Sequence, residues 1–352
     1  MPRPPSRHLS PTPGRGRPVA ELMTPVAERT SSAAELQHSF RAMASPVNVR
    51  IIDPAAGAGE AVAAVEQCFR DVERECTRFD PESDLMRANA AGEEWAEVGP
   101  HCFQAITSAY DAYRASEGAF DPRVYSALVA LGYSEGDTFA AGPVSVGTVG
   151  ARAEIREEWA PAFDREGGRV QVGSLPLDLG GIGKGLAVRG GREILLAASA
   201  GSAVLVEAGG DLATAGYGPH REAGEVRAWR VAVESPFGGS GSAAVLDASD
   251  AAVATSSVRL RSWKAQGRDV HHLIDPRTGE PSDGGIASVT VLAHDPAWAE
   301  VWTKVLFIEG RARAAQFAEE HGLAALWIDV DGVVHVSGAM APRVLWKVPC
   351  VQ

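Results

Sequence analysis

The chain has 352 residues, a formal net charge of −12 at pH 7, 45% apolar residues and 22% charged residues. This balance is typical of a soluble globular protein, and its acidity argues against nucleic-acid binding, which requires a basic surface. No stretch approaches the ~18 consecutive apolar residues of a membrane span, so we expect no stable membrane insertion. The four cysteines show no zinc-ligand spacing.

Residues 1–36 are rich in proline, arginine and serine and lack a sustained apolar run. That composition predicts a disordered tail, and the absence of an apolar segment with a cleavage motif argues against a signal peptide. We therefore expect one large domain over residues 37–352 and a cytoplasmic location.

The first regular elements are predicted soon after the tail. Residues 46–52 alternate valine and isoleucine with polar side chains, which predicts a half-buried strand. Apolar residues then recur every three or four positions from Val62 to Cys76, the spacing of an amphipathic helix, and a turn follows at Pro81. The same spacing from Phe103 to Tyr113 predicts a second helix.

Strands and helices alternate irregularly toward the C-terminus. The patterns predict two short strands within residues 167–181, a helix over 182–198, a buried strand starting at 203, a strand and turn over 269–281, helices over 299–310 and 311–322, and a hairpin over 326–337. This mixture lacks a strict βαβ rhythm, so it predicts an α+β fold or an α/β fold with a mixed sheet.

The stretch "PLDLGGIGKGLAVRGG", residues 176–191, contains six glycines and one lysine. It is no Walker A loop, because Gly185 follows Lys184, and it breaks the GxGxxG dinucleotide fingerprint at Leu186. One interpretation is that the glycines only permit tight packing of a strand and a helix. The other is an anion site, because a helix N-terminus beside a cation binds negative charge and Asp178 lies close by in sequence.

Other polar clusters are consistent with a binding site. "GAFDP" carries Asp121, "AGGD" carries Asp211, "VATSS" supplies hydroxyl groups, and "HHLIDPRTG" places His272 three residues before Asp275. Each cluster alone also has a structural interpretation. Asp121 can cap a turn, and His272 can be a hydrogen-bonded structural histidine.

Taken together and in this order, the clusters resemble the FAD:protein FMN transferase family, also called the ApbE family. "FRAMAS" is similar to the Met-Gly-Thr motif of its first strand, and "RFDPESDLMRAN" to its next conserved segment. "GAFDP", "DLGGIGKGLAV", "AGGD", "ATSS" and "HHLIDPRTGEP" follow in the family's order. The resemblance extends from about Phe40 to Val344 and implies a single α/β domain with an α+β mixed sheet, similar to a T-fold.

The resemblance implies a role for particular residues of this chain. The expected FAD-binding residues are Met43, Phe79, Ala119, Phe120, Asp121, Asp178, Lys184 and Ile274. The expected catalytic residues are His272, which corresponds to a histidine in the family's cleft, and Lys304. Gly181 would offer a carbonyl oxygen to a magnesium ion, and Asp275 would hold the geometry of its turn.

The sequence departs from the family at the magnesium site. The family pattern places an aspartate and a threonine four residues apart as ligands, whereas this chain has Glu300 and Lys304. Both still lie on one helix face, but an ammonium group has no lone pair for a metal. Thr303 lies about 100° away around the helix and is a poor substitute. Glu300 and Gly181 therefore remain candidate ligands of a Mg²⁺ ion whose presence the sequence leaves open.

Two functions follow from the resemblance. The first is transfer of FMN from FAD, through a phosphoester bond, to a threonine or serine of an acceptor flavoprotein with an FMN-binding domain, with release of AMP. The second is an FAD carrier or FAD hydrolase of the same fold that modifies no protein. The expected ligand is FAD in both cases.

Overall fold

The computed structural model describes residues 34–133, 157–198, 201–219, 228–239, 241–259, 261–265 and 267–348. The predicted tail up to residue 33 lies outside these residues. No helix in the described ranges is long and apolar enough to cross a membrane. The described part of the chain forms one unit that begins at Ala34.

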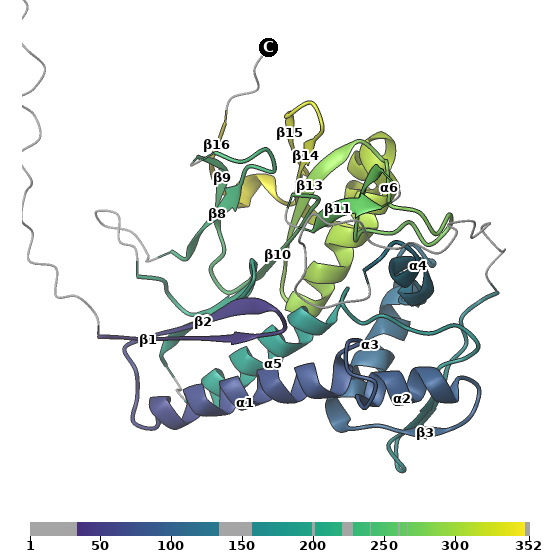
Figure 1. Ribbon diagram of the computed structural model, residues 1–352. Helices are drawn as coiled ribbons and strands as arrows, with labels where there is room; N and C mark the ends of the chain where they lie inside the picture. The colour runs from purple at the N-terminus through teal and green to yellow at the C-terminus, as the bar shows by residue number, and fades with distance from the viewer. Residues whose placement is uncertain are drawn as a thin grey trace, which may run out of the picture. The chain divides into compact units, whose positions relative to one another are not determined.

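Eight of the described strands form an antiparallel sheet in the order β1-β2-β6-β7-β10-β13-β14-β15 (Figure 1). They are β1 (Glu35–Ala42), β2 (Ser45–Ile52), β6 (Ala203–Ala208), β7 (Asp211–Ala215), β10 (Ala252–Ser257), β13 (Ile286–Ala293), β14 (Ala324–Asp329) and β15 (Val334–Val336). Because all these neighbours are antiparallel, the α+β alternative of the predicted fold is confirmed.

The sheet begins with a hairpin that the sequence predicted only in part. β2 starts at Ser45, close to the predicted strand, but its partner β1 begins at Glu35, inside the stretch assigned to the tail. The two-residue turn between them consists of Met43 and Ala44, with φ angles of 52° and 56°. Left-handed backbone is costly for residues other than glycine, and the Met43 N–H is fixed by a 2.8 Å hydrogen bond to Glu73 Oε1.

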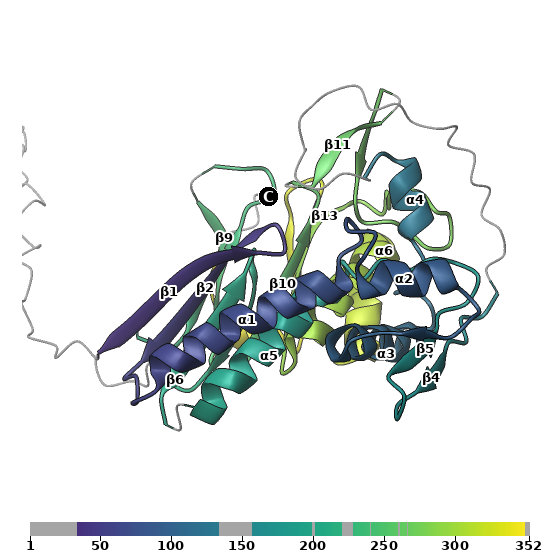
Figure 2. The same cartoon turned by 60° about the horizontal axis from the view of Figure 1, so that its bottom comes forward.

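Three long helices lie against the sheet: α1 (Ala58–Cys76), α5 (Gly183–Ala198) and α6 (Pro296–Glu320). Figure 2 shows α1 and α5 running side by side, and α5 in turn contacts α6. Val65 and Phe69 of α1 are buried in the same core as Val49 of β2 and Leu195 of α5. The helical spacing that predicted α1 is therefore the spacing of its buried face.

The glycines of the stretch over residues 176–191 fall into two groups, and the first confirms the packing interpretation, while the anion site stays a prediction. Gly185, Gly190 and Gly191 allow helices and side chains to approach closely, because a Cβ at Gly185 would lie 2.5 Å from Ala297 Cα of α6. Gly180, Gly181 and Gly183 instead line a cavity. The cavity-lining glycines thus precede or begin α5, and the packing glycines lie within it.

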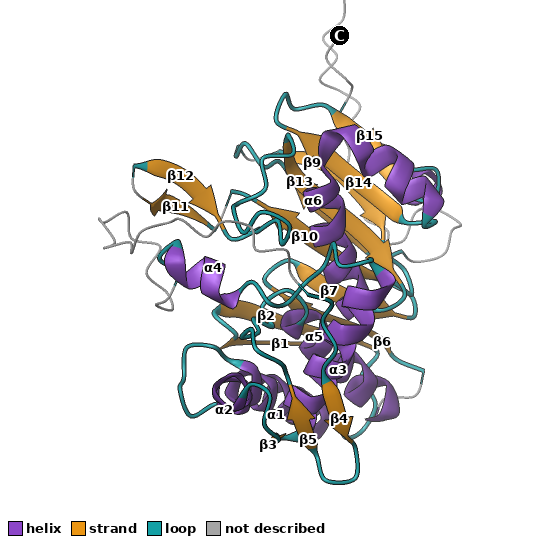
Figure 3. Cartoon of the chain, turned by 90° about the vertical axis from the view of Figure 1, so that its right-hand side faces the viewer, coloured by secondary structure: helices purple, strands orange, loops and turns teal. Residues whose placement is uncertain are grey.

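The C-terminal helical region was predicted as two helices that meet after residue 310, and α6 is interrupted at that point. Gly310 has a φ of 70° and interrupts the helical backbone there. A Cβ at Gly310 would lie 2.9 Å from Gly284 Cα, so glycine is required both by the backbone and by the approach of the preceding loop. The helix lies across β10 and β13 in Figure 3.

The remaining elements complete the described fold. They are α2 (Asp84–Ala91), α3 (Pro100–Ala115), α4 (Tyr125–Ala130), β3 (Ala96–Glu97), β4 (Ala162–Asp164), β5 (Arg169–Gln171), β8 (Arg230–Glu234), β9 (Ser242–Asp247), β11 (Ser262–Ala265), β12 (Arg268–His271), the 3-10 helix Ala341–Arg343 and β16 (Val344–Lys347). The strand predicted at the start of residues 269–281 corresponds to β12, and the predicted hairpin of residues 326–337 to β14 and β15.

One predicted strand is wrong. Within residues 167–181 only β5 is a strand, and residues 172–180 are irregular. Leu177 exchanges hydrogen bonds of 2.8 and 2.9 Å with the side chain of Asn89, and the Asp178 N–H donates to Pro122 O at 2.7 Å. The backbone polar groups are therefore satisfied without a partner strand, and the loop is fixed beside the cavity.

Candidate active site

A single cavity collects residues from widely separated parts of the chain. Its wall includes all predicted FAD-binding and catalytic residues and one of the two candidate metal ligands, namely Met43, Phe79, Ala119, Phe120, Asp121, Asp178, Gly181, Lys184, His272, Ile274 and Lys304. Glu300, the other candidate ligand, is not part of the wall, and its side chain is only 2% exposed. The contacts of these residues indicate what the cavity can bind.

Glu300 is at the centre of a buried ionic cluster behind the cavity. Its Oε1 atom lies 3.2 Å from Lys184 Nζ and 3.3 Å from Lys304 Nζ, while Oε2 accepts a 2.8 Å hydrogen bond from the Gly185 N–H. Lys184 also pairs with Asp211. Burial opposes ionisation of Glu300, but the two lysines outweigh it and hold the pKa of this carboxyl at about 2.

The two lysines differ in their environments. Burial works against a charge on Lys184, but its carboxylate partners Asp211 and Glu300 outweigh burial and raise its pKa. Burial lowers the pKa of Lys304, and the positive charge of Lys184 adds to that effect. Glu300 opposes this lowering of the Lys304 pKa. Within the described ranges, Lys304 pairs with Glu300, whereas Lys184 pairs with both Asp211 and Glu300, and both lysines line the cavity.

The residues present do not fit the magnesium site that the family resemblance implies. Both oxygens of the Glu300 carboxylate are engaged by protein donors, and Lys304 brings a positive charge in place of an oxygen ligand. Thr303 is turned away and buried, donating to Glu300 O at 2.7 Å and lying 2.7 Å from Ser256 Oγ. In the described ranges, no three histidine, cysteine, aspartate or glutamate side chains are grouped to hold a metal.

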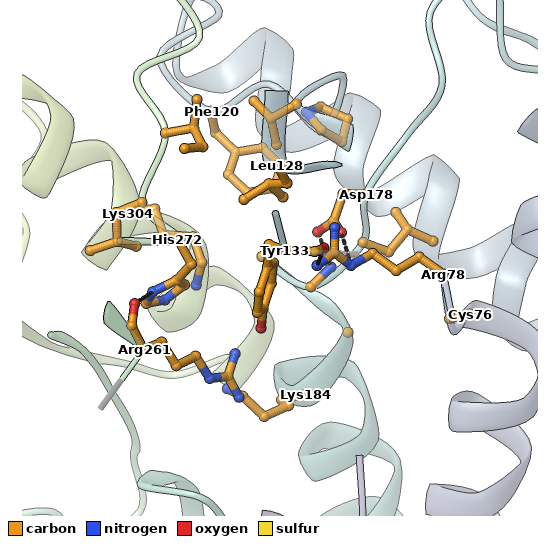
Figure 4. Close-up of a pocket in the computed structure, with 18 of the residues that line it drawn as sticks. Cys76, Arg78, Phe120, Leu128, Tyr133, Asp178, Lys184, Arg261, His272 and Lys304 are labelled. Carbon is orange, nitrogen blue, oxygen red and sulfur yellow. Dashed lines mark hydrogen bonds and ion pairs between the residues drawn. The ribbon is translucent and has the colours of Figure 1, made fainter. Parts of the chain in front are cut away.

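His272 lies on the same side of the cavity as Lys304 and Arg261 (Figure 4). Its Nδ1 atom is 3.3 Å from the carbonyl oxygen of Arg261. Because a carbonyl oxygen only accepts hydrogen bonds, this contact favours the tautomer with the proton on Nδ1 and a lone pair on Nε2. Burial and then the charges of Arg261 and Lys304 place the pKa of His272 well below its usual value.

The opposite side of the cavity is formed by Arg78 and Asp178, with Tyr133 between the two sides in Figure 4. Arg78 Nε lies 3.1 Å from Asp178 Oδ2, and the guanidinium carbon is 4.7 Å from the Phe79 ring and 4.1 Å from the Tyr133 ring. The Nη1 atom of Arg78 is buried and has no protein partner within the described ranges.

The Asp121 carboxylate, which was predicted to bind FAD, is hydrogen-bonded to Arg123 of the protein itself. Its carboxylate receives hydrogen bonds of 3.0 and 2.9 Å from the Arg123 side chain and 2.9 Å from the Arg123 N–H. The Arg123 guanidinium also donates to Glu157 O at 2.9 Å. Asp121 thus fixes the wall segment that begins at Ala119, and its direct contact with FAD stays a prediction.

We expect Asp178→Asn to lower the free energy of unfolding by about 2 kcal/mol, because it removes the charged partner of a buried guanidinium. The side chains of Arg78 and Asp178 are only 6% and 10% exposed. Asp269→Asn is the control, since Asp269 and its partner Lys264 are 82% and 68% exposed, and should cost less than ~1 kcal/mol. Urea unfolding of the two variants tests this, and equal losses would contradict it.

The sequence did not single out several residues of this cavity. Arg78 and Arg261 supply guanidinium groups, and Tyr133 supplies an aromatic ring. Arg78 is the first residue of the family-like segment "RFDPESDLMRAN", a signal that could have identified it. Arg261 lies in no recognised motif, and only the fold brings it beside His272.

Comparison with known proteins agrees with this geometry. The ApbE family profile matches residues 43–327. The chain belongs to the ApbE family. An FAD:protein FMN transferase of Klebsiella pneumoniae is 26% identical over 280 residues, covering 78% of each chain, and one of Rhodobacter capsulatus is 29% identical over 322 residues, covering 89% of this chain and 59% of the relative.

Solved structures show the same ApbE fold. The crystal structure of the Thermotoga maritima ApbE protein matches with a TM-score of 0.75 and 25% identity, covering 88% of this chain and 99% of that one. The flavin transferase ApbE of Vibrio cholerae matches with a TM-score of 0.69 and 23% identity over 88% of this chain and 99% of its own. The predicted family and fold are confirmed.

Proposed function

We propose that this chain is an FAD:protein FMN transferase, which moves FMN from FAD to a threonine or serine of an acceptor protein. The observation that carries this proposal is the cavity itself. It unites a glycine-rich loop at the start of α5, the cations Lys184, Lys304 and Arg261, and a histidine whose pKa is held low. The names of the curated relatives support the same activity.

FAD fits the chemistry of this wall. A helix N-terminus with adjacent lysines favours a pyrophosphate, and α5 is 16 residues long. The apolar and aromatic part of the wall, including Phe79, Phe120 and Tyr133, offers surfaces for flat rings. The Arg78 side chain also lines this wall, where it contacts the Phe79 and Tyr133 rings.

The reaction is an in-line phosphoryl transfer. The acceptor hydroxyl oxygen forms a bond to the FMN phosphorus, the bond from that phosphorus to the AMP oxygen breaks, and AMP leaves with that electron pair. The hydroxyl proton passes to Nε2 of His272 and then to solvent. Lys184, Lys304 and Arg261 stabilise the negative charge that moves onto the AMP phosphate.

The acceptor is a separate flavoprotein with an FMN-binding domain, and the reaction takes place in the cytoplasm. The acceptor follows from the family resemblance, and the location from the absence of a predicted signal peptide. The alternative, a carrier or hydrolase that modifies no protein, differs in one measurable respect. A hydrolase releases AMP at the same rate with or without an acceptor, and a carrier releases none.

We expect purified protein to bind FAD and to release AMP in step with a gain of mass on an acceptor. The test mixes the protein, FAD and an FMN-binding-domain protein that carries a threonine in its flavin motif. AMP is measured by chromatography and the acceptor by intact mass spectrometry. An acceptor variant with alanine at that threonine is the control. AMP release that is unaffected by this change would refute the transferase and support the hydrolase.

A further inference from the structure

Lys304 lies where the family pattern places a metal ligand, and its side chain lines the cavity beside Gly181. A Cβ built on Gly181 would be 3.3 Å from both Cδ and Cε of Lys304. Gly181 is the residue whose carbonyl the family resemblance assigns to magnesium. The lysine stem therefore packs against this part of the loop, and Figure 4 shows Lys304 near His272 at the cavity.

The charges around this position are already balanced without a metal. Lys184 and Lys304 are compensated by Asp211 and Glu300, and their side chains are between 2% and 16% exposed. Arg261 adds one more positive charge on the cavity wall. The two lysines and the two carboxylates cancel, so Arg261 leaves a net positive charge at this position, which disfavours a divalent cation.

The same charges suit a pyrophosphate. FAD carries two negative charges on its phosphates, and Lys304 and Arg261 face the cavity that contains His272. An ammonium acts as a compact point charge toward phosphate oxygens and donates up to three hydrogen bonds. Glu300 holds Lys304 in place, because the pair is one helical turn apart on α6.

We propose that the Lys304 ammonium takes the place of the divalent cation, so that this protein binds and cleaves FAD without magnesium. The proposal rests on the transferase function described above. As the bond between the FMN phosphorus and the AMP oxygen breaks, Lys304 donates a hydrogen bond to the phosphate that receives the electron pair. The remaining bond changes are those of the transfer to the acceptor hydroxyl, and no other reactant is required.

The experiment measures FAD affinity by fluorescence quenching and AMP release by chromatography, each in EDTA and in added magnesium. In the native protein we expect both quantities to change less than about twofold between the two conditions. Lys304→Thr combined with Glu300→Asp should bind FAD at least about tenfold more weakly in EDTA and recover most of the loss with magnesium. Lys264→Thr is the control, because that lysine is 68% exposed and pairs with Asp269 outside the cavity.

Calorimetric titration of the protein with magnesium alone gives a second readout that needs no activity. The native protein should show no binding at millimolar magnesium, and the double variant should gain a site. A native protein that loses FAD affinity in EDTA and regains it only with magnesium would overturn the proposal, as would a native magnesium site. If FAD affinity is insensitive to EDTA but an acceptor is never modified, the metal-free site stands and the transferase function fails.

Discussion

His272→Gln is expected to lower the rate of AMP release by roughly 10²–10⁴-fold while FAD affinity changes by less than about threefold. The reason is the position of the ring. Its Nδ1–H points to the carbonyl oxygen of Arg261, 3.3 Å away, which leaves Nε2 with a free lone pair at the cavity. Glutamine keeps a polar side chain of similar reach but offers no basic nitrogen.

The pKa of His272 gives a second observable. Burial and the charges of Arg261 and Lys304 lower this pKa well below the usual histidine range, and the neighbouring His271 adds to the effect. The ring therefore stays neutral and able to accept a proton at pH values where an ordinary histidine is protonated. The acid side of the rate profile should fall only below that ordinary range, and the His272→Gln variant should lack this fall.

His271→Gln is the matched control, because the two histidines are adjacent and have different surroundings. His271 Nε2 lies 2.9 Å from Ser282 O, and its ring packs edge-on against Phe307 at a centroid distance of 5.7 Å. It is not part of the cavity wall. We expect this variant to lower the melting temperature while AMP release per folded molecule stays near native. Equal losses of rate in the two variants would show that His272 acts only through the structure.

The sequence predicted the cavity wall because its residues occur in short, polar, glycine-flanked segments. Asp178, Lys184 and His272 each stand beside a motif that is recognisable without the fold. The tertiary fold then brings these segments together, since the loops that follow α1 and β12 and precede α5 meet at one cavity. The motifs therefore identified the wall residues, and the fold places them around one cavity.

Other features depended on contacts that local patterns do not encode. The segment around Leu177 has the apolar residues of a strand, yet Asn89, 88 positions earlier, satisfies its backbone. Glu300 was a candidate metal ligand because it occupies the position of the aspartate in the family's magnesium pattern, and the sequence showed only Lys304 as a neighbouring cation. Lys184, 116 positions away, is its second partner, and only the packing of α5 on α6 brings the two together.

The last expectation concerns that packing. Gly185→Ala should lower the free energy of unfolding by at least ~3 kcal/mol, because a new Cβ would overlap atoms that cannot rotate away. It would lie 2.5 Å from Ala297 Cα, 2.6 Å from Pro296 O and 2.8 Å from Ala297 N, all of them backbone atoms at the start of α6. The helices would have to separate, and chemical denaturation measures the resulting loss.

Gly183→Ala, two residues earlier, isolates the steric cause. The nearest atom to a Cβ there is Met43 Cε at 3.5 Å, an ordinary contact with a flexible side chain. Because alanine also favours a helix over glycine, this variant should stay within about 1 kcal/mol of the native stability. A Gly185→Ala protein as stable as Gly183→Ala would mean that α5 and α6 can shift apart freely. In that event the 2.8 Å hydrogen bond from the Gly185 N–H to Glu300 could not be what aligns Glu300 with Lys184.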